Sequence, residues 1–190
     1  MRLAVLGSTN GTDIEAIVAA IKSGEINAHI EVVVSNKKDS GILKKAKNHS
    51  IDSYYVSHKN KKRGVFDLEM SQILENKKID LILLIGFMRI LSSSFVEKWA
   101  GKIINVHPSL LPKHAGGMNR SVHESVLLSG DDKTGCTIHL VTKEVDSGPI
   151  LLQLSCPVKK GDTVEDLKNR VQALEGRAFI QVIKNWRNNE

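Results

Sequence analysis

Two residues near the middle of the chain, Asn105 and His107, have side chains that could act together on a reacting carbonyl group. They are two positions apart in an apolar run that Pro108 ends, so both side chains should point to the same side of a strand. Ligands of open α/β sheets bind beyond the carboxyl ends of the strands. An amide donor beside an imidazole can stabilise a developing oxyanion and move protons. The alternative is a capped strand end with a structural histidine.

A carboxylate that could assist His107 lies far along the sequence, in the turn Asp146-Ser147-Gly148-Pro149. An Asp in a tight turn is usually a turn-former. If this turn folds back toward His107, however, its carboxylate would favour the charged form of the imidazole. The sequence therefore gives Asp146 a role that depends on the fold.

The loop Gly7-Ser8-Thr9-Asn10-Gly11-Thr12-Asp13 leads from the first strand directly into a helix. Backbone N–H groups at a helix N-terminus, together with the helix dipole, suit a phosphate group. The loop matches neither G-x-G-x-x-G nor a Walker A sequence, so dinucleotide and nucleoside triphosphate binding lose support. The alternative is an ordinary strand-to-helix turn with Thr12 or Asp13 as the N-cap.

Metal and covalent chemistry have weaker support. Seven histidines occur in the chain, and four of them lie in one stretch: His107, His114, His123 and His139. No H-E-x-x-H pattern or cysteine cluster joins them, so we predict no metal. Ser109 lies outside any G-x-S-x-G nucleophile sequence. Cys136 and Cys156 fit no metal spacing and are expected to be reduced core residues of a cytoplasmic protein.

The elements that must position these residues alternate between strand and helix over the first half of the chain. Apolar, often β-branched runs predict strands at 3–6, 30–34, 53–56, 79–85 and 102–106. Helical spacing predicts helices from about 14 to 21, then at 41–48, 66–75 and 95–99. This βαβαβ order predicts an α/β fold: a doubly wound, mostly parallel sheet with helices on both faces.

The second half of the chain changes character. A helix is expected at 118–128, followed by two extended runs at 136–142 and 150–158. These runs are close in sequence, which predicts an antiparallel pair at the sheet edge. A last helix should begin after Asp162-Thr163 as its cap. No repeat or linker interrupts the chain, so residues 1–190 are predicted to form a single domain.

Composition limits the possible partners. Hydrophobic residues make up 41% of the 190 residues, which is ordinary for a globular domain, and no apolar run is long enough to cross a membrane. No cleavage-site signature follows the N-terminus, so we expect no signal peptide. The net charge of +6 could serve nucleic acid or small anions. Because aromatic residues make up only 4%, stacking platforms for single strands are scarce, and small anionic ligands are favoured.

Three segments taken in order resemble the formyltransferases that use 10-formyltetrahydrofolate: Gly86-Phe87-Met88-Arg89-Ile90-Leu91, Asn105-Val106-His107-Pro108-Ser109-Leu110-Leu111-Pro112 and Asp146-Ser147-Gly148-Pro149-Ile150. The resemblance spans nearly the whole chain. The transfer-RNA enzyme and the folate deformylase of this family carry extra domains that 190 residues would not hold. The resemblance therefore implies a formyltransferase fold, 10-formyltetrahydrofolate as co-substrate and formyl transfer to the amine of glycinamide ribonucleotide in purine biosynthesis.

The resemblance also implies a role for individual positions. It assigns catalysis to Asn105, His107 and Asp146, with Asn105 also touching the folate. The ribonucleotide would be held by Gly11, Thr12, Asp13 and Glu175. The folate would be held by Arg63, Met88, Arg89, Ile90 and Leu91. No metal, nucleic acid or membrane is implied, and the protein could be a monomer or a homodimer.

Two segments depart from the family pattern. Relatives more often read Ser-Gly-x-Gly-Ser-Asn where this chain has Ser8 to Asp13. The carboxylate of Asp13 would repel a phosphate unless its side chain turns away to cap the helix. After Pro112, the residues 113–120 differ from the shorter Gly-x-His-Thr-His of many relatives, which affects the expected substrate contacts there.

The expected mechanism is direct acyl transfer. The amine would attack the formyl carbon while Asn105 and protonated His107 stabilise the oxyanion. Asp146 would keep His107 charged and help to shuttle a proton from the attacking amine to the leaving nitrogen. One alternative is a 10-formyltetrahydrofolate hydrolase, in which water replaces the amine. Another is a non-catalytic nucleotide- or RNA-binding module, suggested by the lysine runs, which would bind RNA in a strongly salt-dependent manner.

Overall fold

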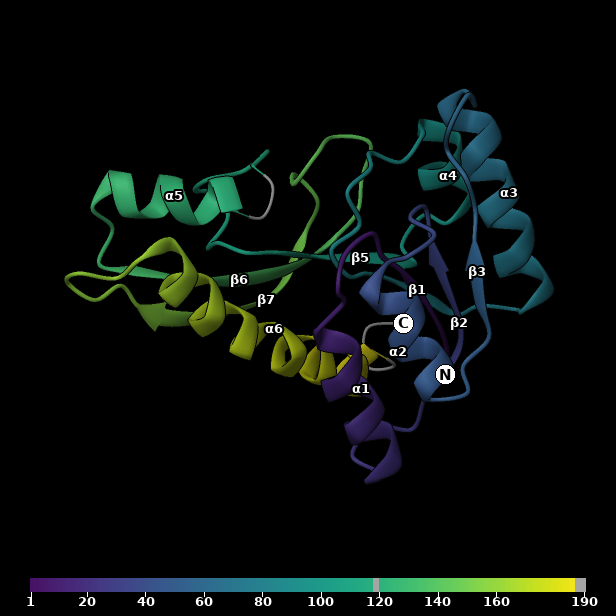
Figure 1. Ribbon diagram of the computed structural model, residues 1–190, viewed down its shortest axis with the longest axis horizontal. Helices are drawn as coiled ribbons and strands as arrows, with labels where there is room; N and C mark the ends of the chain where they lie inside the picture. The colour runs from purple at the N-terminus through teal and green to yellow at the C-terminus, as the bar shows by residue number, and fades with distance from the viewer. Residues whose placement is uncertain (118–119, 187–190) are drawn as a thin grey trace.

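A seven-stranded sheet runs through the computed structural model, which describes residues 1–117 and 120–186 (Figure 1). The strands are β1 (Arg2–Leu6), β2 (His29–Ser35), β3 (Ser53–Tyr55), β4 (Leu81–Leu84), β5 (Ile103–His107), β6 (Lys133–Leu140) and β7 (Ile150–Pro157). The helices are α1 (Asp13–Lys22), α2 (Gly41–Asn48), α3 (Arg63–Asn76), α4 (Ser93–Lys98), α5 (Arg120–Ser129) and α6 (Val164–Asn185).

The strand order is β3-β2-β1-β4-β5-β6-β7. The first five strands are parallel, whereas β6 is antiparallel to β5, and β7 is antiparallel to β6 at the edge. The central strand β4 reads Leu-Ile-Leu-Leu and is buried throughout, as expected for a strand covered on both faces. The predictions of a doubly wound, mostly parallel sheet and of an antiparallel edge are therefore confirmed.

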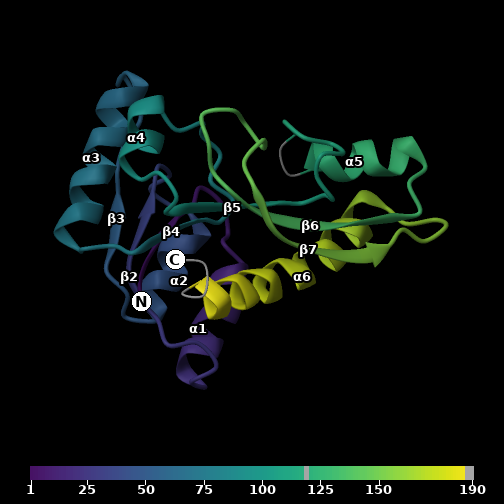
Figure 2. The ribbon, with the colours of Figure 1, turned by 180° about the vertical axis from the view of Figure 1, so that it is seen from behind.

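Helices cover both faces of the parallel strands (Figures 1 and 2). On one face, α1, α2 and α6 bury apolar side chains that include Ile14, Ile17, Ile42, Val171 and Phe179. On the other face, α3 and α4 bury Phe66, Met70, Leu74, Phe95 and Val96. Because the helical spacing of these residues aims them at the sheet, burial of their apolar surface holds the layers together.

Several predicted elements differ from the observed ones at their ends. The strand expected at 79–85 is observed as Leu81–Leu84, and next to it the Asp80 carboxylate accepts a hydrogen bond from the Arg2 N–H at 2.7 Å. The helix expected at 66–75 begins already at Arg63, in an exposed turn without an apolar signal. The helix expected at 118–128 is observed as Arg120–Ser129, while Met118 and Asn119 lie outside the described residues. The cap predicted for the last helix is confirmed, since Thr163 forms a capping box with Asp166.

The sheet has a switch point between β1 and β4. From β1 the chain proceeds to β2 and β3 on one side, whereas β4 continues to β5 on the other. Ligands of such sheets bind beyond the carboxyl ends of the strands at this point. Among the helices of the described residues, none has the length and apolar character to span a membrane.

Candidate active site

Two adjoining cavities lie at the carboxyl ends of the central strands. The first, here called the 88–91 cavity, is lined by the segment after β4, by β5 and by the loop before β7, including Met88, Arg89, Ile90, Leu91, Asn105, His107, His139 and Asp146. The second, the helix-α1 cavity, is lined by Thr9, Gly11, Thr12, Asp13, His123, Lys168, Gln172 and Glu175, among others. Gly86, Met88, Val106 and Pro108 line both cavities, so the two spaces share a wall.

The loops after β1 and β4 are tied directly to each other. The Met88 N–H donates to the Ser8 hydroxyl oxygen at 2.8 Å, and that hydroxyl donates to Asn36 at 2.6 Å. Gly86 has a positive φ of 57°, and a Cβ there would lie 2.2 Å from the Thr9 hydroxyl oxygen. Only glycine therefore allows the two loops to approach this closely.

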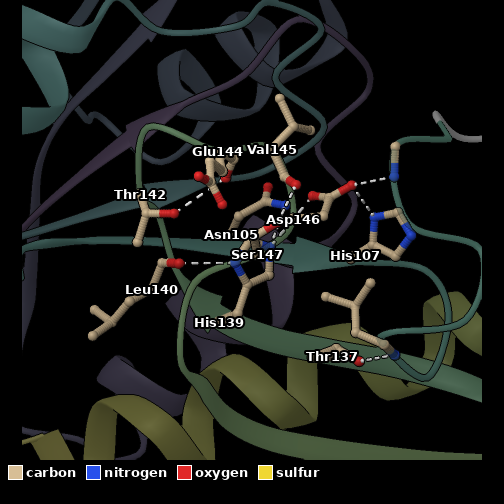
Figure 3. Close-up of polar contacts among 12 residues, drawn as sticks. Asn105, His107, Thr137, His139, Leu140, Thr142, Glu144, Val145, Asp146 and Ser147 are labelled. Atoms are coloured by element: carbon tan, nitrogen blue, oxygen red, sulfur yellow. Dashed lines mark hydrogen bonds and ion pairs between the residues drawn. The ribbon is translucent and has the colours of Figure 1, made fainter.

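Asn105, His107 and Asp146 lie together at the wall of the 88–91 cavity (Figure 3). The Asp146 Oδ2 atom is 3.2 Å from His107 Nδ1 and also accepts a hydrogen bond from the Gly116 N–H at 2.9 Å. The turn that carries Asp146 thus folds back onto β5. The sequence had made this return the condition for Asp146 to assist His107. The structure brings together the three residues proposed for catalysis.

His139 joins this group, although the sequence analysis gave it no such place. Its Nδ1 atom lies 2.9 Å from the Leu140 carbonyl oxygen, which can only accept, so Nδ1 carries a proton. The Nε2 atom of the neutral ring then accepts a hydrogen bond from Asn105 Nδ2 at 3.1 Å. Its 3.5 Å distance from Asp146 Oδ1 is long for a hydrogen bond. His139 therefore fixes which end of the Asn105 amide is the donor, and the second hydrogen of that amide is left for a ligand.

Two opposing effects act on the carboxyl of Asp146. Burial raises its pKa, but hydrogen bonds and the nearby charge of His107 outweigh burial, so the pKa lies well below the ordinary value. The carboxylate consequently stays ionised throughout the neutral range. The ionised, nearly buried carboxylate can accept a hydrogen bond from His107 Nδ1 when that nitrogen carries a proton.

The Thr137 hydroxyl of β6 forms two hydrogen bonds with the segment after His107. Thr137 donates to the Ser109 carbonyl oxygen at 2.7 Å and accepts from the Leu111 N–H at 3.0 Å. The Ser109 hydroxyl is buried and donates to the Lys113 carbonyl oxygen at 2.7 Å. Ser109 therefore has a structural part in the loop.

The helix-α1 cavity presents backbone donors. No hydrogen bond formed within residues 1–117 and 120–186 uses the backbone N–H groups of Thr12 and Asp13 at the start of α1. Thr12 occupies the N-cap position, but its side chain forms no capping hydrogen bond. These donors and the helix dipole suit an anion.

Two buried carboxyl groups, those of Asp13 and Glu175, line the same cavity. Burial raises the pKa of Asp13 to about 7 and that of Glu175 to about 8, and the nearby Asp13 contributes to the shift at Glu175. The expectation that Asp13 turns away to cap α1 is wrong, because the side chain lies in the cavity and caps nothing. Protonation of the buried pair, rather than capping, limits the negative charge near the backbone donors.

The residues expected to hold folate divide into two groups. Met88, Arg89, Ile90 and Leu91 all line the 88–91 cavity, where the Arg89 guanidinium lies 5.4 Å from the centre of the Phe66 ring. Arg63 is exposed in the first turn of α3 and does not line this cavity. A contact between Arg63 and folate stays a prediction.

Among the described residues, no group of three or more His, Cys, Asp or Glu side chains could hold a metal ion. Cys136 and Cys156 are buried free thiols. The prediction that no metal takes part stays a prediction.

The doubly wound sheet, with a polar trio beside two adjoining cavities at the carboxyl ends of its strands, places the chain in the open α/β class. Sequence comparison gives the family: the chain belongs to the formyl transferases, whose family model matches residues 1–183. The resemblance found in the sequence and the formyltransferase fold are thereby confirmed.

Relatives are similar over nearly the whole chain. This chain is 44% identical over 184 residues to the trifunctional purine biosynthetic protein adenosine-3 of Bos taurus. The aligned region covers 96% of this chain but only 18% of that protein. The chain is 37% identical over 187 residues to phosphoribosylglycinamide formyltransferase of Escherichia coli (strain K12), covering 98% and 86% of the two chains. The crystal structure of glycinamide ribonucleotide transformylase 1 from Symbiobacterium toebii superposes with a TM-score of 0.95 at 34% identity, covering 100% and 88%.

Proposed function

We propose that this chain transfers the formyl group of 10-formyltetrahydrofolate to the amine of glycinamide ribonucleotide, a step of purine biosynthesis. The observation that carries the proposal is the shared wall of the two cavities, next to Asn105, His107 and Asp146. One ligand in each cavity would meet where the trio lies. The names of the relatives in Escherichia coli and Symbiobacterium toebii support the same reaction.

The chemistry of the 88–91 cavity fits a folate. Its walls combine apolar side chains with backbone groups of the segment after β4, including Leu84, Phe87, Ile90, Leu91 and Val141. A flat, partly apolar heterocycle with polar edges requires both kinds of surface. The Nε atom of Arg89 is buried and has no hydrogen-bond partner among the described residues. We assign Met88 to Leu91 to the folate on this basis.

The chemistry of the helix-α1 cavity fits a ribonucleotide. The N–H groups of Thr12 and Asp13 would donate hydrogen bonds to its phosphate, as helix N-termini do. Glu175 lies on α6 in the same cavity and could hydrogen-bond the ribose hydroxyls. The amine of the ribonucleotide would then point across the shared wall toward the formyl group.

Asn105 and His107 act on the formyl oxygen in this mechanism. As the amine nitrogen attacks the formyl carbon, negative charge develops on that oxygen. The free amide hydrogen of Asn105, oriented by His139, and an N–H group of His107 stabilise this charge. The Asn105 donor is oriented before the reaction, whereas the Nε2–H of His107 must turn from the His114 carbonyl oxygen, 3.0 Å away, to the formyl oxygen.

Asp146 acts on the protons. The attacking amine loses a proton as the new C–N bond forms, and the folate N10 gains one as the old C–N bond breaks. The carboxylate and the His107 ring that it keeps charged can relay this proton between the two nitrogens. The formyl group is thus exchanged with no covalent bond to the protein.

A formyl-transfer assay tests the proposal. The absorbance of the folate is followed with the purified chain, 10-formyltetrahydrofolate and glycinamide ribonucleotide, and the formylated ribonucleotide is identified by mass. We expect turnover that requires both ligands and is lost in His107→Ala. Turnover of the folate at the same rate without the amine would instead favour a 10-formyltetrahydrofolate hydrolase.

An RNA-binding module is separated from this proposal by a second measurement. The described part of the chain places a polar trio at a cavity wall, which RNA binding does not require. We propose that the chain binds small molecules and neither RNA nor a membrane. Salt-dependent RNA binding without formyl transfer would contradict the proposal.

We further propose that residues 1–190 act as one domain, in the cytoplasm, and as a monomer or homodimer. The free state of both cysteines supports a reducing compartment. Light scattering of the purified chain measures the oligomeric state.

A further inference from the structure

The segment 113–117, which departs from the family pattern, lies directly against the catalytic trio. The His114 carbonyl oxygen is 3.0 Å from His107 Nε2. Two residues later, the Gly116 N–H donates to Asp146 Oδ2 at 2.9 Å. One short segment therefore contacts both members of the His107–Asp146 pair, and it does so with backbone groups only.

The side chain of His114 anchors this segment on its far side. Its Nε2 atom lies 2.9 Å from Asp131 Oδ2, and its Nδ1 atom lies 2.8 Å from the Ser125 hydroxyl oxygen. Lys113 adds an ion pair to the other oxygen of Asp131 at 2.7 Å. Hydrogen bonds from His114 and Lys113 lower the pKa of Asp131 to about 2, so this anchor stays charged.

The backbone of His114 requires such an anchor. Its φ is 60°, which lies in the left-handed region that residues other than glycine seldom adopt. A residue keeps this conformation only where its surroundings hold it there. The ring contacts with Asp131 and Ser125 hold the same residue whose carbonyl oxygen faces His107, so they restrain that carbonyl.

The contacts of His107 determine how many protons its ring carries. Its Nε2 atom faces a carbonyl oxygen and its Nδ1 atom faces an ionised carboxylate. Both oxygens can only accept, so both contacts are hydrogen bonds only when both ring nitrogens carry protons. The carbonyl of His114 therefore favours the charged ring from one side, as Asp146 does from the other.

We propose that His114 and Asp131 are positioning residues, which hold the segment 113–117 so that its backbone orients His107 and Asp146 and favours the doubly protonated His107 ring. Neither residue lines the two cavities that would hold the ligands of the proposed function. The reacting formyl oxygen competes with the His114 carbonyl for a ring proton that is already in place. The expected effect on kcat rests on the proposed function. The expected effect on the orientation and protonation of His107 does not.

Variants of Asp131 test the proposal by kinetics. Asp131→Ala removes the anchor of His114, and we expect kcat to fall about 10- to 100-fold with little change in either KM. Asp131→Asn keeps an oxygen that can accept from His114 Nε2, and should recover most of that loss. Asp132→Ala is the matched control, because Asp132 is the exposed neighbour with no side-chain contact among the described residues.

The ¹⁵N spectrum of the His107 ring tests it independently of activity. Its signals are assigned by their loss in His107→Ala. At neutral pH we expect the pattern of a doubly protonated ring in the unaltered chain and in Asp132→Ala, and a shift toward the neutral pattern in Asp131→Ala and His114→Ala. Thermal melting confirms that the variants are folded, and Asp131→Asn serves if an alanine variant is not.

Two results would overturn the inference: a neutral His107 ring in the unaltered chain, or Asp131→Ala and Asp132→Ala with the same kcat and the same ring spectrum. Failure of the proposed function would look different. In that case the unaltered chain would show no transfer to glycinamide ribonucleotide, while the ¹⁵N spectra would still respond to Asp131→Ala.

Discussion

The Asp146 carboxylate lies 3.2 Å from the Nδ1 atom of His107, although one residue lies in the loop before the edge strand β7 and the other ends β5. The contact is nearly buried, with 3% of the His107 side chain and 9% of the Asp146 side chain exposed. Charge interactions are stronger where water is largely excluded. Asp146 is therefore well placed to control the charge and orientation of His107.

Asp146→Asn should lower kcat by roughly 10²- to 10⁴-fold while both KM values stay within about threefold. The amide keeps the shape of the carboxylate but cannot stabilise a charged imidazole. Steady-state kinetics at several pH values measure the effect. The exposed Asp39→Asn, which lies outside both cavities, is the control and should leave kcat unchanged. Near-normal kcat in Asp146→Asn would exclude the proposed proton relay.

His139→Ala should lower kcat about 10- to 100-fold, because the Asn105 amide loses the partner that fixes its orientation. His139→Gln restores an acceptor for the Asn105 amide, so its kcat should fall less than that of His139→Ala. The distinguishing measurement is the ratio of kcat to KM for the folate, since a fault confined to the transition state leaves KM unchanged. An equal rise of KM in both variants would point to a collapsed cavity instead.

The residue pattern placed Asn105 and His107 together at the end of a strand, but it left open whether the turn of Asp146 returns to them. Only the resemblance grouped the three residues, because a contact between such distant segments depends on the fold. The residues that the resemblance implied for the two ligands line the two cavities, except Met88, which lines both, and Arg63, which lines neither. His139 was missed because its position opposite Asn105 depends on the register between β5 and β6. The pattern of β6 shows only which residues share a face, and not which residue of β5 each one meets.

The hydrogen bonds of segment 113–117 and the burial of Asp13 could not be predicted from the sequence, for other reasons. Gly116 acts through its backbone N–H, which every residue except proline has, so its identity carries no signal. Asp13 looked like a helix cap because Asp is common there. Its burial follows from the close approach of α1 and α6, where the Asp13 backbone would lie 4.0 Å from a Cβ on Gly176. That approach is a tertiary property.

Asp13→Asn should make the KM for the ribonucleotide less dependent on pH. In the unaltered chain the Asp13 carboxyl loses its proton near pH 7, and Glu175 follows near pH 8. The negative charge then opposes the phosphate, so KM should rise above neutral pH by up to about tenfold per unit. The variant removes the first of these charges. KM measured from pH 7 to 9 checks this, with the exposed Asp39→Asn as control; parallel KM curves for Asp13→Asn and the unaltered chain would contradict it.

Glu175→Gln should lessen the loss of stability at alkaline pH. The folded-state pKa of Glu175, about 8, lies above its ordinary value of 4.5, so its protonated form contributes stability that is complete below about pH 4.5 and is lost as pH rises through 8. The glutamine cannot ionise and should avoid that loss. Melting temperatures at pH 6 and pH 9 measure it, with about 2–4 °C expected for each kcal/mol. An equal fall in both proteins would place the alkaline sensitivity elsewhere, for example at Asp13.

Gly176→Ala should destabilise the protein although alanine is the better helix former. Gly176 lies in the middle of α6, where the replacement alone would favour the helix by about 1 kcal/mol. However, the new Cβ would lie 2.7 Å from the Ala16 Cβ of α1, and neither atom can move without its backbone. Overpacking of this kind costs about 1–3 kcal/mol and should outweigh the helical gain.

The matched control for Gly176→Ala is Gly64→Ala in α3, where a Cβ would have no neighbour within 4 Å and the melting temperature should rise. A second effect separates the two sites. Displacing α1 from α6 moves Asp13 away from Glu175, so Gly176→Ala should also raise the KM for the ribonucleotide and leave that for the folate unchanged. A rise in the melting temperature of both variants would mean that α1 and α6 are not packed this closely. The backbone N–H groups of α1 that would bind the phosphate would then not be fixed relative to Glu175.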